Sequence, residues 1–179
     1  MSISISPPRP DGSGDNFTDT GPVLGPVSPS ALGQMAALCW RLKKGRVEVM
    51  MVTSRETGRW VIPKGWPMEG IAPEEAAARE AWEEAGALGK VSADPLGRFV
   101  YDKVLRDRSV RSCCVTVYPL RLREVKSRWP ERKERRRKWF DAEEAAGLVA
   151  ETGLSDLFLA LAQDPGLVAP PARHRKAKG

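Results

Sequence analysis

Three glutamates in one short segment are the strongest chemical signal in this sequence. Glu80, Glu83 and Glu84 are spaced so that, on a helix turning about 100° per residue, they share one face. Nothing in residues 74–85 breaks a helix, and Gly86 is a natural stop. Carboxylates on one helix face repel one another, whereas a hard cation such as Mg²⁺ or Mn²⁺ takes oxygen ligands and reverses that repulsion. The pattern therefore predicts a metal site, with a solvated acidic face as the alternative.

The residues around these glutamates form a longer pattern. In register along the chain stand Gly65, Arg79, Glu80, Glu83, Glu84 and Gly86. This spacing resembles the Nudix box, the loop–helix–loop signature of Nudix hydrolases. The chain departs from the family pattern at Ile71, where the family has its first Glu, and at Ala87, where the family has a larger apolar residue. Since the first family Glu mainly braces the site, Ile71 affects metal geometry more than the number of ligands.

The resemblance covers residues 34–163 and implies both a fold and a reaction. The fold is α+β, a mixed β-sheet sandwiched between α-helices. The reaction is Mg²⁺-dependent (or Mn²⁺-dependent) hydrolysis of a phosphoanhydride bond. The implied metal ligands are Glu80, Glu83, Glu84 and the carbonyl of Gly65. The residues expected to take part in catalysis are Glu83, Glu80, Arg79 and Glu131.

Two of these residues have roles that sequence reasoning leaves open. Arg79 stands four residues before Glu83, so it can brace the carboxylates from the side. A separate loop often supplies the general base in this family, and either Glu131 or Glu134 suits that position. Glu83 could instead orient the attacking water.

The segments flanking the box narrow the branch of the family. Residues 59–67 and the later Trp129-Pro130-Glu131 resemble bacterial relatives of diphosphoinositol polyphosphate and diadenosine polyphosphate phosphohydrolases. Their substrates are dense in phosphate, which Arg binds through a bidentate fork and Lys as a point charge. The expected substrate-binding residues are Lys64, Arg41, Lys103, Arg111 and Arg132, each with a solvated surface charge as its alternative. Trp66 could stack on a base, although we favour packing for this side chain.

Composition limits the classes of protein to which the chain can belong. Its net charge is +6, and residues 121–138 contain ten Lys or Arg against three Glu, which indicates an anionic partner or a solvated basic run. No apolar run approaches the ~18 residues of a membrane span, and no secretory signal is visible. Three cysteines without CxxC spacing indicate free thiols, hence a cytoplasmic location, and argue against zinc.

Periodicity and turn residues predict the remaining organisation. We expect a disordered tail over residues 1–33, a domain over 34–163 and a basic flexible tail over 164–179. Strands are expected at 35–41, 47–53, 60–62, 96–101, 110–122 and 138–140, with residues 86–95 as a connecting segment. Asp141 is expected to cap a helix over 142–149, and Ser155 a helix over 156–162.

Two other functions compete with a small-molecule pyrophosphohydrolase. A non-catalytic phosphate-binding module would explain Ile71, but it would not explain the retained glutamates. An RNA 5′-pyrophosphohydrolase would use the basic run, yet no aromatic-rich stacking pattern accompanies that run. Neither the exact substrate nor the oligomeric state follows from the residues.

Overall fold

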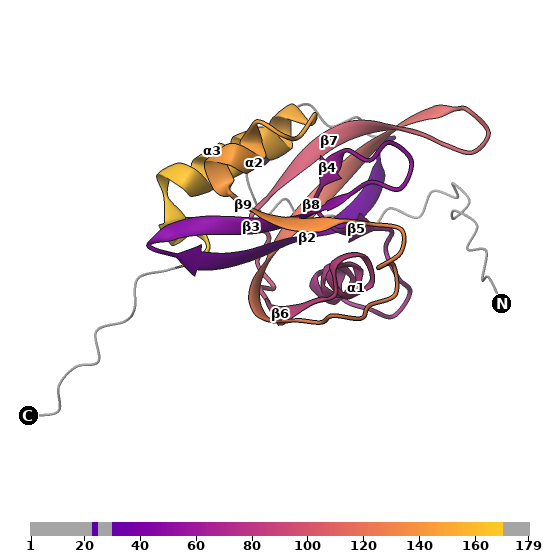
Figure 1. The fold of residues 1–179 in the computed structure, drawn as a ribbon. Coiled ribbons are helices and arrows are strands. Elements are labelled where there is room, and N and C mark those ends of the chain that lie inside the picture. The colour runs from indigo at the N-terminus through magenta and orange to yellow at the C-terminus, as the bar shows by residue number, and fades with distance from the viewer. Residues whose placement is uncertain (1–22, 25–29, 170–179) are drawn as a thin grey trace, which may run out of the picture.

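The structure is a computed structural model and describes residues 23–24 and 30–169. Within these ranges one mixed sheet holds the strands β1 (Val23–Leu24), β2 (Leu32–Lys43), β3 (Arg46–Thr53), β4 (Trp60–Val61), β5 (Lys64–Gly65), β6 (Ala87–Val91), β7 (Gly97–Val104), β8 (Val110–Val125) and β9 (Arg137–Asp141). The helices are α1 (Pro73–Ala85), α2 (Ala142–Ala146), α3 (Thr152–Gln163) and the short 3₁₀ helix η1 (Pro165–Leu167). Figure 1 shows α1 on one side of the sheet and α2 and α3 on the other.

The strand order explains how distant segments meet. The main path runs β1-β7-β8-β2-β3-β4, while β5 pairs with β2, β6 with β8, and β9 with β3. Strands β2 and β8 run parallel, and the β2–β3 pair is antiparallel. The two-residue turn between β2 and β3 has positive φ at both Lys44 and Gly45, the backbone that a tight hairpin needs.

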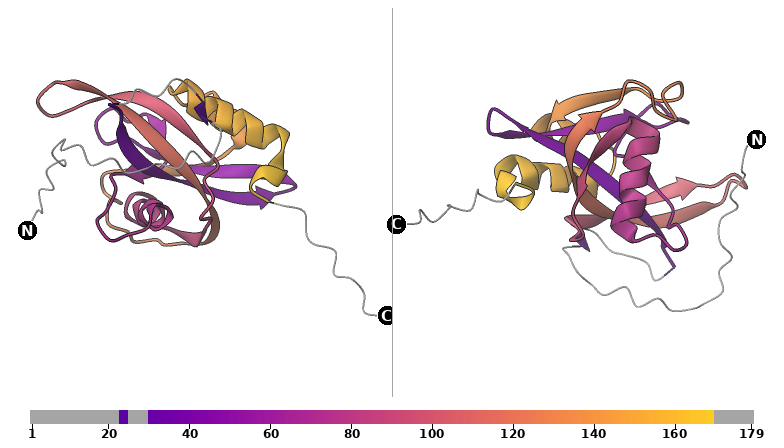
Figure 2. Two further views of the ribbon diagram at one scale, coloured as in Figure 1. Left: turned by 180° about the vertical axis from the view of Figure 1, so that it is seen from behind. Right: turned by 90° about the horizontal axis from the view of Figure 1, so that it is seen from below.

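Alternating side chains of the central strands supply two separate cores. Along β2, the buried residues 36, 38 and 40 face the cluster that contains α2 and α3, whereas 35, 37 and 39 face the cluster that contains α1. Helix α3 contributes Leu154, Leu157, Phe158 and Leu161, an i, i+3, i+4, i+7 stripe. The two views in Figure 2 agree that the helices cover opposite faces. The predicted sandwich of a mixed sheet between helices is confirmed.

The predicted helix over 74–85 is confirmed, with Gly86 as its left-handed cap. The segment 86–95 is not merely a connection, because residues 87–91 form β6. This strand contains Gly89, where a Cβ would lie 2.2 Å from the Arg121 carbonyl oxygen, and the register shifts between Leu88 and Gly89. Pairing with β8 creates the strand, so its own sequence carried little signal.

The C-terminal helices also differ from the prediction. Helix α2 ends at Ala146, and Asp141 makes no side-chain cap. Helix α3 begins at Thr152, so Ser155 lies inside it and donates a hydrogen bond to the Ala146 carbonyl at 2.8 Å. The serine therefore joins the two helices, and the expected cap at Ser155 is wrong.

Regular structure extends past the predicted 34–163 boundaries at both ends. Strand β2 begins at Leu32, β1 pairs with β7, and Val168 after η1 belongs to the core. The remaining parts of the predicted tails, residues 1–22, 25–29 and 170–179, lie outside the described residues. Among the helices that are described, none is long and apolar enough to cross a membrane. Cys39, Cys113 and Cys114 are free thiols, as predicted.

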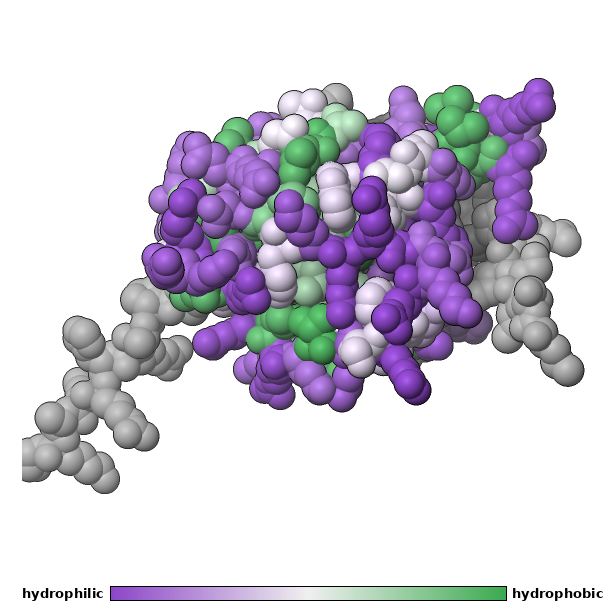
Figure 3. All heavy atoms as spheres, in the orientation of Figure 1, coloured by the Kyte–Doolittle hydropathy of each residue, from purple (hydrophilic) through white to green (hydrophobic). Residues whose placement is uncertain are grey.

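Most of the surface in view is hydrophilic. Figure 3 shows hydrophobic side chains only in small patches, one of them over the tip of the β7–β8 hairpin. At that tip Val104 and Val110 are each 60% exposed.

Candidate functional site

A pocket of about 430 Å³ brings most of the predicted site residues together. Its walls come from α1, β5, β7, the turn after β3 and the loop before β9. The predicted residues that line it are Lys64, Gly65, Glu80, Glu83, Glu84, Lys103 and Glu131. A larger hollow, of about 570 Å³, is lined by a single carboxylate, Asp94, so it lacks the acidic cluster that hydrolytic chemistry would use.

Gly65 lets a carboxylate of α1 lie against the backbone of β5. A Cβ at this position would stand 2.0 Å from Oε1 of Glu80, so any larger residue would displace that group. Burial, together with the nearby charges of Glu84, Glu83 and Glu131, raises the pKa of Glu80 to about 7. Four carboxylates on one side of the pocket therefore repel one another.

Glu84 is buried, so the alternative of a solvated acidic face does not hold for this residue. It is only 6% exposed, and Oε1 accepts a hydrogen bond from Nη2 of Arg135 at 2.5 Å. Burial raises the pKa of Glu84 to about 7, although the positive charges of Arg135 and Lys64 oppose that rise.

Arg135 connects three parts of the site. Besides Glu84, its Nε donates to Oε2 of Glu131 at 2.5 Å and its Nη1 donates to the Thr53 carbonyl at 3.0 Å. Its side chain is 7% exposed. Because both carboxylates bind the same guanidinium, the loop that carries Glu131 is held against the acidic helix.

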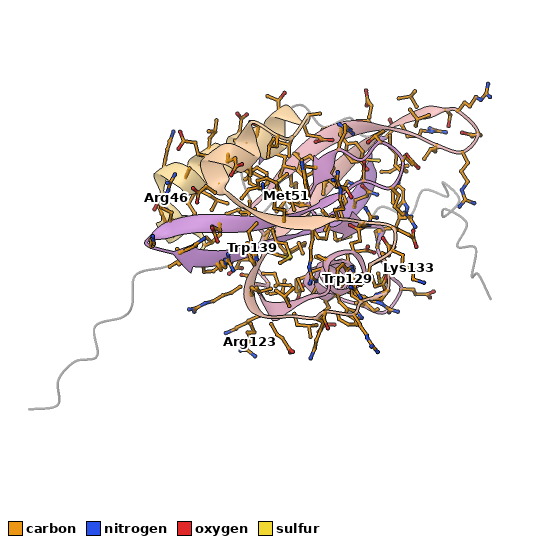
Figure 4. All side chains as sticks on the ribbon, in the orientation of Figure 1. Arg46, Met51, Arg123, Trp129, Lys133 and Trp139 are labelled. Carbon is orange, nitrogen blue, oxygen red and sulfur yellow. The ribbon has the colours of Figure 1, made fainter. Side chains whose placement is uncertain are left out.

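The loop before β9 also caps α1. The last carbonyls of a helix lack partners within it, and here side-chain and backbone groups of this loop and of the first residue of β9 supply them. Trp129 Nε1 donates to the Glu84 carbonyl at 3.2 Å, and Arg137 Nη1 donates to the Ala85 carbonyl at 2.6 Å. The Glu131 amide donates to the Glu83 carbonyl at 3.0 Å. Figure 4 shows Trp129 beside α1.

Part of the basic run therefore has a structural role. Arg137 lies 3.9 Å from the centre of the Trp129 ring while it donates to α1. Of the cations in residues 121–138, only Arg135 lines the pocket. The interpretation of this run as a single binding surface for an anion does not apply to Arg135 and Arg137.

Four predicted residues lie outside the pocket. Arg41 donates to Glu48 at 2.6 Å and lies 4.1 Å from the centre of the Trp139 ring, so it is used elsewhere in the structure. Arg111 pairs with Lys103 across the β7–β8 hairpin and is exposed. Arg132 is exposed near Trp129. Arg79 also lies outside, but its Nε donates to Oε1 of Glu83 at 2.9 Å, the expected bracing contact.

Lys64 and Lys103 each lie over an aromatic ring at the pocket. Nζ of Lys64 is 5.2 Å from the centre of the Tyr101 ring, and Nζ of Lys103 is 5.0 Å from that of Trp66. Burial lowers the pKa of Lys64. Trp66 belongs to neither core cluster, so the packing interpretation of this side chain is not supported.

Several pocket residues escaped sequence reasoning because no local pattern marks them. They are Gln34, Arg55, Arg59, Tyr101, Arg135 and Glu151. They come from five segments, with Arg55 and Arg59 on the same turn, and reach the pocket only through strand pairing or loop packing. Of the two loop glutamates considered as general base, Glu131 lines the pocket. Glu134 does not, and it pairs with Arg55 at 3.2 Å.

The donor set has the chemistry of a divalent-cation site. Across the described residues no three Asp, Glu, His or Cys side chains are arranged so that they could hold a metal ion. Glu80, Glu83, Glu84 and Glu131 nevertheless supply only hard oxygen donors. Besides burial, the charges of the other three raise the pKa of Glu80, and a divalent cation would relieve this repulsion. The residues fit Mg²⁺ or Mn²⁺ by donor type and charge.

Comparison with known proteins assigns the chain to a family. The NUDIX domain matches residues 33–159. Nudix hydrolase 12, mitochondrial, of Arabidopsis thaliana is 36% identical over 106 residues, which is 58% of this chain and 52% of that protein. Diphosphoinositol polyphosphate phosphohydrolase 2 of Rattus norvegicus is 35% identical over 116 residues, covering 62% and 58%. The chain thus spans little more than half the length of these relatives.

A solved structure supports the same fold. The C. elegans Ap4A hydrolase aligns with a TM-score of 0.55 at 18% identity, covering 74% of this chain and 97% of that one. At this identity the likeness concerns the fold alone.

Proposed function

The chain belongs to the NUDIX family, and we propose that it is a hydrolase that uses a divalent metal ion to cleave a phosphoanhydride bond in a small phosphorylated substrate. The observation that carries this proposal is that one pocket brings Lys64 and Lys103 together with the carboxylates of Glu80, Glu83, Glu84 and Glu131. The carboxylates suit a cation, and the lysines suit phosphate. The names of two relatives, a Nudix hydrolase and a diphosphoinositol polyphosphate phosphohydrolase, support the same chemistry.

The roles of the acidic residues follow from their positions. Glu80, Glu83, Glu84 and the carbonyl of Gly65 would hold Mg²⁺ or Mn²⁺. When bound, the cation would polarise a phosphoryl oxygen and lower the pKa of a bound water. Arg79 orients Glu83 through their hydrogen bond, and Arg135 orients Glu84.

The other residues would bind substrate and move a proton. Lys64 and Lys103 would bind the phosphates as point charges. Glu131 would accept a proton from the attacking water, and Glu83 is the second candidate for that role. Glu131 is held by Arg135 at the edge of the carboxylate cluster, which supports its assignment over Glu134.

Two substrate classes agree with the relatives and with the sequence: a nucleotide polyphosphate such as a diadenosine polyphosphate, and an inositol pyrophosphate. Both present a phosphoanhydride bond that a bound cation and two lysines can engage. An RNA 5′ end is less favoured, because most of the basic run that would bind RNA lies outside the pocket.

Product release from a substrate panel tests the proposal. The panel contains a diadenosine polyphosphate, an inositol pyrophosphate, a nucleoside diphosphate sugar and triphosphorylated RNA, each with and without Mg²⁺. Glu83→Gln should abolish turnover and keep the fold, because it removes an oxygen ligand and a candidate base. Glu75→Gln is the matched control, since Glu75 is exposed on the same helix and does not line the pocket.

Each outcome has a clear consequence. Mg²⁺-dependent cleavage by the native chain, lost in Glu83→Gln and kept in Glu75→Gln, supports the hydrolase. An active Glu83→Gln with unchanged metal dependence contradicts the site assignment. Binding of phosphate ligands without cleavage of any of the four compounds would favour the non-catalytic module, with Ile71 as the first residue to restore to Glu.

A further inference from the structure

Most of the positive charge in the pocket is already neutralised. Arg55, Arg59 and Arg135 each lie within 4 Å of a carboxylate, in pairs with Glu131 and Glu134, with Glu151, and with Glu84 and Glu131 respectively. Among the described residues that line the pocket, Lys64 and Lys103 are the cations without such a partner. Two lysines suit a short phosphate chain better than a ring phosphorylated on every side.

Glu151 adds a buried negative charge to the same pocket. It precedes α3 and is 9% exposed. Its Oε1 lies 3.6 Å from Nη1 of Arg59, whereas its Oε2 is buried and accepts no hydrogen bond from the described residues. An unsatisfied buried carboxylate oxygen is costly, so this position calls for a hydrogen-bond donor. Because Glu151 lines the pocket, a turn of its side chain would present the buried Oε2 to a donor on a ligand.

The surroundings of Glu151 are polar and uncharged on one side. Gln34 is 2% exposed and accepts a hydrogen bond from the Tyr101 hydroxyl at 2.7 Å. Both side chains line the pocket together with Glu151. Burial raises the pKa of the Tyr101 hydroxyl, and the charge of Glu151 adds to that rise. This part of the pocket can form hydrogen bonds with a neutral group, whereas the negative charge of Glu151 disfavours an anion.

An aromatic ring is available for a planar group. Trp66 lines the pocket, is half-buried and belongs to neither core cluster. Lys103 lies over it, so a ring stacked there would also be next to a cation that can bind phosphate. A nucleoside joined to a short phosphate chain matches this combination, whereas an inositol pyrophosphate has no planar group.

We propose that Glu151 is a specificity-determining residue that selects a nucleoside beside the cleaved phosphates and rejects a phosphoryl group at that position. The inference rests on the proposed hydrolase function and narrows its substrate to a nucleotide polyphosphate. An N–H of the base or a ribose O–H donates to Oε2 of Glu151. A phosphate in the same place would have to compete with the Glu151 carboxylate for Arg59 and would be repelled by that carboxylate.

Two substitutions at Glu151 separate its charge from its acceptor. Glu151→Met removes both at similar length, and Glu151→Gln removes only the charge. Steady-state kinetics with Mg²⁺ would compare diadenosine tetraphosphate with an inositol pyrophosphate. Loss of one hydrogen bond to a charged acceptor corresponds to about tenfold to a hundredfold in binding. We expect Glu151→Met to raise KM for the nucleotide by about tenfold or more, with kcat changed less than about twofold.

For the inositol pyrophosphate we expect substitution of Glu151 to improve catalysis instead of weakening it. Glu151→Gln should raise kcat/KM for the inositol pyrophosphate, because the repelling charge is gone. A native chain that cleaves the inositol pyrophosphate at least as well as the nucleotide overturns the inference and leaves the hydrolase intact. If Glu151 served only to hold Arg59 in place, the Arg59→Met variant would raise KM as much as Glu151→Met does. An equal rise of KM in the two variants therefore also overturns the inference.

Binding keeps the inference testable without turnover. Calorimetry with Mg²⁺ and a methylene-bridged diadenosine tetraphosphate, which resists hydrolysis, should show about tenfold weaker binding to Glu151→Met than to the native chain. If the native chain cleaves neither substrate but this difference is found, the hydrolase proposal fails, while the role of Glu151 in selecting a bound nucleoside is supported. Equal affinities overturn it. Two analogues identify the donor: a purine riboside analogue lacks the exocyclic amine, and a 2′-deoxy analogue lacks the ribose 2′-hydroxyl. The missing group is the donor in the analogue that binds the native chain and Glu151→Met with equal affinity.

Discussion

A methyl group added at Gly65 would test whether the carboxylate of Glu80 must lie against strand β5. A Cβ there would stand 2.0 Å from Oε1 of Glu80 and 2.3 Å from Cδ. An ordinary contact between heavy atoms is about 3.5 Å, so the carboxylate has to retreat by about 1 Å or more in Gly65→Ala. Displacing a catalytic group by about 1 Å costs on the order of a hundredfold in rate.

The same substitution should leave the fold nearly unchanged. The displaced atoms are the end of a flexible side chain, and the φ of Gly65 is not one that disfavours alanine. We expect the free energy of unfolding to change by less than about 1 kcal/mol. The Mg²⁺ concentration for half-maximal activity should rise together with the loss of kcat/KM, because Glu80 is an expected ligand.

Activity assays and urea unfolding of the same preparations check this expectation. Gly147→Ala is the matched control, since the nearest heavy atom to its added Cβ would be the Glu144 carbonyl oxygen at 3.6 Å. Full activity of Gly65→Ala at unchanged Mg²⁺ requirement would refute the reasoning. A large loss of stability would show that the methyl group strains β5 instead of moving the carboxylate.

Three further predictions follow from the described contacts. Arg135→Met should lower the free energy of unfolding by about 3–5 kcal/mol, because it leaves a buried carboxylate without its cation, whereas the exposed neighbour in Arg136→Met should cost less than about 0.5 kcal/mol; equal losses in urea unfolding would contradict this. The pKa values of Glu80 and Glu84 are raised from 4.5 to about 7 in the fold. Protonation of these two groups therefore stabilises the metal-free fold fully below pH 4.5, and this stabilisation is lost as pH rises through about 7. Thermal unfolding should therefore show that Mg²⁺ stabilises the chain more at pH 8 than at pH 5, and a pH-independent effect of Mg²⁺ would contradict it. Ile71→Glu should keep or raise activity, since Ile71 belongs to neither core cluster; failure of that variant to fold, judged by circular dichroism, would show that the side chain packs in an apolar niche.

Local signals in the chain were sufficient to predict the acidic helix and the segment that leads into it. Pro73 and Gly86 bound α1 because their effects on the backbone act within one turn. Lys64 and Gly65 lie one short loop before that helix, and the resemblance to the Nudix box predicted their place beside its carboxylates. The β2–β3 hairpin was predictable for the same reason, since its turn at Lys44 and Gly45 is a local choice of φ.

Other features depend on contacts between segments far apart in the chain. The strand β6 forms because β8 offers it partners, so a glycine-containing segment without clear alternation becomes a strand. Arg41 was expected to bind substrate because it ends the first long strand, yet Glu48 across the hairpin and Trp139 on β9 hold it elsewhere. Charge alone does not reveal whether a cation is already paired.

The sequence by itself determined the acidic helix and the loop from Gly65 that leads into it. The spacing of the residues in these two segments also indicated the family of the chain. The sequence did so because helix periodicity and backbone preference are local properties that residue types carry with them. Only the tertiary structure decided that Arg135 neutralises Glu84, that Lys64 and Lys103 remain without carboxylate partners, and that Glu151 reaches the pocket. Burial and ion pairing are properties of neighbours in space. Glu84 and Arg135 are 51 residues apart in the chain, and only the packing of the loop before β9 against α1 makes them neighbours.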